Sequence, residues 1–78
     1  MSKTYATYDL NLASTLLTLG YKLIELDREN IRKVKFVFKH RKGIEQSIND
    51  FWDDKITLPA KTLLANQKTL KNRIYTDA

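Results

Sequence analysis

The hydrophobic pattern is organised around two β-rich runs, residues 21–26 and 31–40, which are separated by a polar break at residues 28–30. Short runs of this kind on either side of a polar segment are typical of an antiparallel hairpin. Successive side chains of a strand point to opposite faces of the sheet. On the second run one face is apolar, and we expect it to be buried: Val34, Phe36 and Phe38. The other face should be solvated and basic: Lys33, Lys35, Val37 and Lys39.

The first run, residues 21–26, alternates less regularly between apolar and polar side chains. With strict alternation, Tyr21 and Leu23 share one face, while Lys22, Ile24 and Leu26 share the other. Both faces are then partly apolar. We therefore predict that this strand either lies centrally or packs under a helix on one side and a partner on the other.

Apolar spacing elsewhere in the chain predicts three helices. The first covers residues 10–19, with Asp9 as its N-cap and Gly20 as the left-handed residue after its end. The second helix has four residues on one face that we expect in the core: Ile44, Ile48, Phe51 and Trp52. The third begins at Pro59, where proline suits a first turn. Its apolar stripe is Ala60, Leu63, Leu64, Leu70 and Ile74.

A short β-rich segment at residues 4–8 completes the set as an edge strand. The order strand, helix, strand, strand, helix, helix predicts an α+β fold. We expect a three-stranded, largely antiparallel sheet with the hairpin at its centre and the helices packed on one face. With 78 residues, the chain should form one small domain, residues 1–78, with a thin margin of stability.

Charge adds a functional hint. The chain has 14 lysines and arginines against 9 acidic residues, and half of the basic ones fall within residues 28–42. A basic field favours anionic partners, although lysines on a strand also protect a sheet edge from aggregation. The candidate nucleic-acid-binding residues are Arg32, Lys33, Lys35, Lys39, Arg41, Lys42, Lys68 and Lys71.

The sequence offers few candidates for catalysis. It has no cysteine, and its one histidine, His40, lies between two cations. Ser14 and Ser47 lie inside predicted helices without a sequence-adjacent base. Asp50 and Asp54 lie one helical turn apart, but two carboxylates alone hold a cation weakly. The two glycines cannot form a phosphate-binding loop. We expect a protein that is not an enzyme, with no cofactor and no metal site.

The lysine-alternating strand followed by two helices resembles the ribbon–helix–helix repressors, which place a strand pair in the major groove of DNA. In that arrangement the outward residues would read bases: Lys33, Lys35, Val37 and Lys39. Two features depart from that family. The strand has a predicted partner, residues 21–26, in its own chain, and the link at residues 53–59 is longer than a tight turn.

Over nearly its full length, the chain also resembles a small family of prokaryotic and phage domains of unknown function, built as strand–helix–hairpin–helix–helix. The matching segments are Asp9-Leu10, Gly20-Tyr21-Lys22-Leu23, Lys35-Phe36-Val37-Phe38, Phe51-Trp52, Leu58-Pro59-Ala60-Lys61 and Leu70-Lys71-Asn72-Arg73-Ile74-Tyr75, together with Leu12, Ala13, Leu16 and Leu17. The resemblance implies a domain often carried on mobile elements. It implies no activity and no catalytic residue.

Together these patterns predict a small non-enzymatic binding module that contacts nucleic acid, DNA or RNA, through its basic strand face. The alternative is a protein–protein interaction or inhibitor module of a phage or mobile element, which binds an acidic partner surface with the same face. A small core and an exposed edge strand also favour a homodimer. The longest apolar stretch is too short and polar to span a membrane. With no cysteine and no visible export signal, we expect the protein in the cytoplasm.

Overall fold

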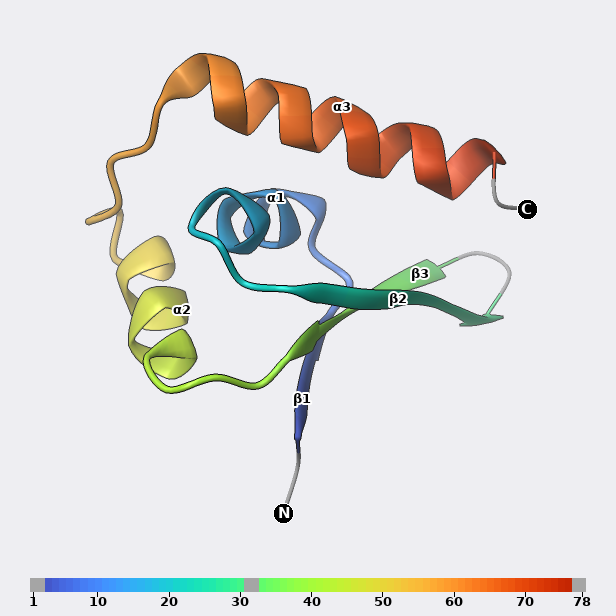
Figure 1. Ribbon diagram of the computed structural model, residues 1–78, viewed down its shortest axis with the longest axis horizontal. Helices are drawn as coiled ribbons and strands as arrows, with labels where there is room; N and C mark the ends of the chain where they lie inside the picture. The colour runs from blue at the N-terminus through green and yellow to red at the C-terminus, as the bar shows by residue number, and fades with distance from the viewer. Residues whose placement is uncertain (1–2, 31–32, 77–78) are drawn as a thin grey trace.

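The computed structural model describes residues 3–30 and 33–76 and confirms the predicted order of elements and the α+β fold. The elements are β1 (Thr4–Thr7), α1 (Leu10–Thr18), β2 (Leu23–Asn30), β3 (Lys33–Lys39), α2 (Ile44–Trp52) and α3 (Ala60–Thr76). The strands form one antiparallel sheet, and the helices gather on one side of it (Figure 1). In this view α1 lies between α3 and the sheet, while α2 lies beyond the end of β3.

The central strand is β3, because it pairs with β1 on one side and with β2 on the other. Tyr5 of β1 lies opposite Phe38, and Leu26 of β2 lies opposite Phe36. Directly opposed residues project from the same face of a sheet. The two edge strands therefore extend the apolar face of β3. The second strand of the predicted hairpin takes the centre, and the first strand forms an edge.

An extra residue in β2 changes which of its side chains face the core. Leu23 lies opposite Phe38, but Glu25 lies opposite Val37, so Ile24 is the unpaired residue of a β-bulge. The bulge interrupts the alternation. As a result Leu23 and Leu26 both pack against the core, and Ile24 is 48% exposed. The prediction that residues 24 and 26 share a face is therefore wrong. The strand also continues through the predicted polar break, residues 28–30.

The two predicted caps of α1 are confirmed. The Asp9 carboxylate accepts hydrogen bonds from two backbone amides of the first turn, at 2.8 and 3.1 Å, and so satisfies donors that have no partner within the helix. Gly20 adopts a φ of 101°, which favours glycine. The amides of Gly20 and Tyr21 donate to carbonyls of the last turn, at 3.1 and 3.0 Å, as in a Schellman motif. These caps direct the chain from β1 into α1 and back into β2.

The core lies between the sheet and the helices, around Phe36 and Phe38 of β3. Both phenylalanine rings are almost completely buried. Val34, the third residue of the predicted apolar face, is half-buried. The other fully buried apolar side chains come from the three helices: Leu12, Ala13, Leu16, Ile44 and Leu70. The helices thus cover the face of β3 that the sequence predicts to be apolar.

Arg28 of β2 ties the sheet to the end of α3. Its guanidinium donates hydrogen bonds to the backbone carbonyls of Arg73 and Ile74, at 2.6 and 3.0 Å. These carbonyls belong to the last four residues of α3, where a helix offers them no partner. Arg28 belongs to the basic run in the sequence, but in the structure its charge stabilises a helix end.

Two large apolar residues depart from their predicted places in the core. Trp52 is 61% exposed, and its ring packs edge-on against Phe51 with ring centres 4.9 Å apart. It is the last residue of α2 and lies at the margin of the apolar stripe, so its side chain is directed away from the core. Leu64 of α3 is also exposed, because it lies about 100° around the helix axis from the half-buried Leu63.

Candidate nucleic-acid interface

The sheet has an open face, which lies opposite Phe36 and Phe38. Alternation along β3 puts three lysines and Val37 on this face. Val37 is nevertheless only 8% exposed, so the expectation that it is solvated is wrong. Its direct neighbours are Ala6 of β1 and Glu25 of β2. A short side chain on a central strand is shielded by the longer side chains around it.

Because β3 pairs with a strand on each side, its arrangement also differs from that of the ribbon–helix–helix proteins. In that arrangement a strand pairs with its counterpart in a second chain and enters the major groove. Here β1 and β2 of the same chain occupy both edges of β3. The open face is therefore a three-stranded surface and not a two-stranded ribbon.

An exposed tyrosine lies close to two lysines at one end of the open face. Tyr8 directly follows β1 and is 56% exposed. The Nζ atoms of Lys33 and Lys35 each lie 5.8 Å from the centre of its ring, within the range of a cation–π contact. These three residues form what we call the tyrosine site. The sequence pattern does not single out Tyr8, because its place beside the lysines depends on the register between β1 and β3.

Acidic residues of β2 lie beside the lysines of the open face. Asp27 is opposite Lys35, and its carboxylate oxygen is 3.9 Å from Nζ. Glu25 is opposite Val37 on the same face. An exposed ion pair of this kind contributes little to stability, but it reduces the positive potential around Lys35. The open face therefore carries less net positive charge than the lysines of β3 suggest. The sequence pattern did not predict this, because the β-bulge determines which β2 side chains lie on the open face.

A second group of cations lies where β3 ends. It consists of Lys22, Lys39, Arg41 and Lys42, all exposed, and we call it the loop cluster. The backbone amide of Lys39 donates to the carbonyl of Lys22 at 2.9 Å, so these two residues are neighbours across the strands. Lys22 is absent from the predicted site, since its place next to Lys39 follows only from the strand register.

The loop cluster is anchored to the core by Tyr21. The guanidinium carbon of Arg41 lies 4.7 Å from the centre of the Tyr21 ring, in a cation–π contact. The Tyr21 hydroxyl is 2.9 Å from Oγ of Ser47, in α2. The buried ring thus holds the start of the β3–α2 loop in place while the arginine stays exposed.

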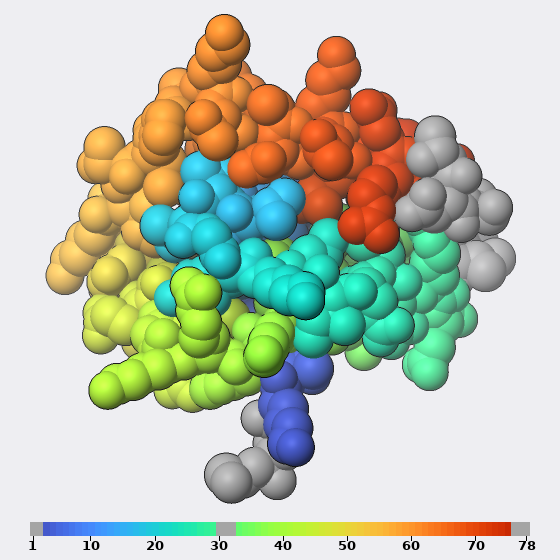
Figure 2. All heavy atoms as spheres, in the orientation of Figure 1, coloured from blue at the N-terminus to red at the C-terminus, as the bar shows by residue number. Residues whose placement is uncertain are grey.

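The structure does not bring all the predicted basic residues together. Lys68 and Lys71 lie on α3, which packs on the core side of the sheet through Leu70. Figure 2 shows α3 along the upper margin and the loop after β3, in yellow-green, at the lower left. These two lysines are thus on a different side of the domain from the open face. Arg32 lies outside the described residues.

The described residues contain no gathering of three or more histidine, cysteine, aspartate or glutamate side chains placed to hold a metal ion. His40 has one close acidic neighbour, with its Nε2 3.5 Å from a carboxylate oxygen of Glu45. In the same part of the chain, no helix is both long enough and apolar enough to cross a membrane.

The chain belongs to a family described as a domain of unknown function (DUF5659), which matches residues 2–76. The match covers all six elements, so the family and the described fold have nearly the same extent. No curated protein and no solved structure matches the chain. The family therefore supplies no activity for this chain.

Proposed function

We propose that this DUF5659 domain is a non-enzymatic module that binds single-stranded nucleic acid with the open face of its sheet and the loop cluster. The observation that carries the proposal is the tyrosine site, where the ammonium groups of two lysines lie close to an exposed ring. Proteins that bind single strands combine cations along the backbone with aromatic rings on which bases stack. A solvated lysine face without a functional role has no need of an exposed ring.

The exposed lysines of the open face and the loop cluster suit binding to the phosphates of a nucleic acid without recognition of its bases. In the described part of the chain, Lys33, Lys39 and Lys42 are exposed and form no ion pair with an acidic side chain. Because phosphate contacts carry no sequence information, the binding is expected to tolerate many sequences and to weaken steeply with salt. The rival partner is an acidic protein surface, which would use the same lysines but has no requirement for the ring of Tyr8.

Replacing Tyr8 separates these two partners. Tyr8→Ala should raise the Kd for single-stranded DNA or RNA by about 5- to 150-fold, because a stacked base contributes about 1–3 kcal/mol. Tyr8→Phe keeps the ring and should bind like wild type. The measurement is a gel shift with single-stranded and duplex DNA and RNA at physiological ionic strength. Equal affinity of the alanine and phenylalanine variants, or no shift with any nucleic acid, contradicts the proposal and favours the acidic protein.

We propose that the protein is encoded by a phage or other mobile element and acts in the cytoplasm of a prokaryotic cell. The resemblance of the chain to such domains supports it. The lack of cysteine is compatible with a reducing compartment.

We also propose that the domain forms a symmetric homodimer. In the described residues β1 and β2 are the two edges of the sheet, and an exposed edge is a template for pairing with a second chain. A small core gains stability from such an interface. Light scattering at high-micromolar concentration should give twice the mass of the chain. A monomer mass at that concentration contradicts the dimer.

A further inference from the structure

An apolar groove adjoins the tyrosine site, at the place where β1 ends and α1 begins. It has a volume of about 360 Å³, which is within the range of small-ligand sites. Its lining comes from four parts of the fold: Tyr8, Leu10, Lys33, Val34, Phe36 and Ile74. Two of these residues, Tyr8 and Lys33, also belong to the tyrosine site. The exposed ring of Tyr8 is therefore the margin of a groove and not an isolated platform.

The groove exists because β1 is shorter than β3. The backbone amide of Asp9 donates to Oγ1 of Thr7 at 3.1 Å, and the Asp9 side chain then caps α1, so the chain leaves the sheet after Thr7. Thr7 lies opposite Phe36. In the described chain, residues 33–35 of β3 therefore have no strand beside them on the β1 side.

Backbone polar groups of β3 are directed toward this open edge. The amide of His40 donates to the carbonyl of Lys3 on the β1 side, at 2.8 Å. Because backbone hydrogen-bonding groups alternate between the two edges of a strand, the N–H and C=O groups of Val34 point to the same side. A donor beside an acceptor matches the Watson–Crick edge of a nucleobase, which proteins read when a base is unstacked.

The wall of the groove that comes from α3 is held in place by Arg28. Its guanidinium donates to the carbonyl of Ile74 at 3.0 Å and to that of Arg73 at 2.6 Å. The Ile74 side chain is half-buried. A wall that is already fixed needs little ordering when a ligand binds, and this lowers the cost of binding.

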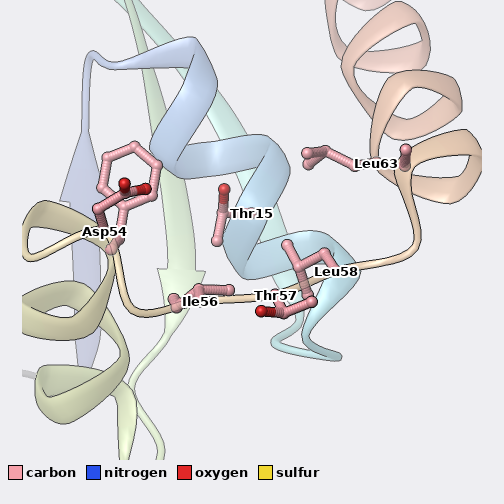
Figure 3. Close-up of a pocket in the computed structure, with 8 residues that line it drawn as sticks. Thr15, Asp54, Ile56, Thr57, Leu58 and Leu63 are labelled. Atoms are coloured by element: carbon pink, nitrogen blue, oxygen red, sulfur yellow. The ribbon is translucent and has the colours of Figure 1, made fainter.

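Charge distinguishes this groove from a larger cleft on the helical side of the domain. That cleft has a volume of about 410 Å³ and lies between α1, the end of α2 and the start of α3 (Figure 3). Among the described residues that line it, the only charged one is Asp54. The groove beside Tyr8 is lined instead by Lys33 and has the Nζ atom of Lys35 within 5.8 Å of the ring centre. Its charge is therefore the one that suits an anionic ligand.

We propose that this groove receives one unstacked base of the bound single strand, with the adjoining phosphate on Lys33. The base packs against Leu10 and Ile74, beside the ring of Tyr8, and its polar edge faces the backbone of Val34. An extended peptide fits less well, because an open edge of three residues offers little strand pairing. The inference rests on the proposed function and specifies the unit that is bound: a nucleotide whose base has left its stack.

The first test is an NMR titration of the ¹⁵N-labelled protein with adenosine 5′-monophosphate. We expect saturable shifts at the amides of residues 8, 10, 33–36 and 74, with a Kd on the order of 1 mM. Adenosine lacks the phosphate and should bind about three- to fivefold more weakly, as expected for one exposed charge contact. Ribose 5-phosphate lacks the base and should give no saturable shifts at these residues. Equal binding of the three compounds, or shifts confined to other residues, overturns the inference.

The second test fills the groove from two different walls. Val34→Phe and Ile74→Phe each add bulk at a half-buried position, and thermal melts show that the variants are folded. Each should weaken binding of the mononucleotide and of a single-stranded oligonucleotide by about fivefold or more, the effect of losing one base contact. Ile24→Phe is the matched control, because it adds a ring at an exposed residue on the other edge strand, and it should bind like wild type.

The two tests separate this inference from the proposed function. If the wild type binds the oligonucleotide and both groove variants bind it equally well, base insertion is overturned while nucleic-acid binding by the open face stands. If the wild type binds no oligonucleotide even at low salt, both are overturned.

Discussion

Phe36→Ala should unfold the domain or leave it barely stable. The Phe36 side chain is 1% exposed and lies on the central strand between Thr7 of β1 and Leu26 of β2. Truncating a buried phenylalanine costs about 3–5 kcal/mol, through lost burial and the cavity that remains. Small domains have a total stability of about 5–15 kcal/mol, and a chain of this size is expected near the lower end. Urea denaturation followed by circular dichroism measures the loss directly.

Ile24→Ala is the matched control for this prediction. Ile24 is also an apolar residue of the same sheet, but it is the exposed residue of the bulge. Its truncation should change the free energy of unfolding by no more than about 0.5 kcal/mol. If Phe36→Ala melts within a few degrees of wild type, then Phe36 is not a core residue and the register of β3 is wrong.

Local signals in the sequence were sufficient for the element order and the core strand. Asp9 and Gly20 mark the ends of α1 because capping depends on the chemistry of single residues near a helix end. Phe36 and Phe38 identify the buried face because alternation along one regular strand needs no information about its partners. These features can be read without knowing which strands pair.

Features that depend on pairing could not be predicted in the same way. The bulge at Ile24 is set by how β2 fits β3, and it decides that Glu25 and Asp27 lie beside the lysines. Likewise Tyr8 and Lys22 join the candidate interface only through the strand register. The exposure of Trp52 depends on where α2 stops relative to α1. Each of these features depends on tertiary structure and could not be predicted from the residue pattern.

Reversing three charges of the candidate interface should nearly abolish nucleic-acid binding. Lys33, Lys39 and Lys42 are all exposed, and Lys35 is left unchanged because a glutamate there would face Asp27. Each lost phosphate contact lowers both the affinity and its dependence on salt. Replacing lysine by glutamate adds repulsion to that loss. The triple variant should bind at least about 100-fold more weakly than wild type at low salt.

A second triple variant controls for net charge. Lys61, Lys68 and Lys71 are exposed residues of α3, on the helical side of the domain. Changing them to glutamate lowers the net charge of the chain by the same amount. If binding depends only on overall charge, the two variants should lose affinity equally. If it depends on the open face and the loop cluster, the α3 variant should stay close to wild type.

The most direct measurement is the fluorescence anisotropy of a labelled single-stranded oligonucleotide, titrated with wild type and both triple variants at several salt concentrations. Thermal melts by circular dichroism first establish that both variants are folded. We predict a wild-type Kd on the order of 10 µM near physiological salt. We further predict a small change for Lys61, Lys68 and Lys71→Glu, and loss of binding with a shallower salt slope for Lys33, Lys39 and Lys42→Glu. Equal losses in the two variants, or no wild-type binding at low salt, would contradict the assignment of the open face as a nucleic-acid interface.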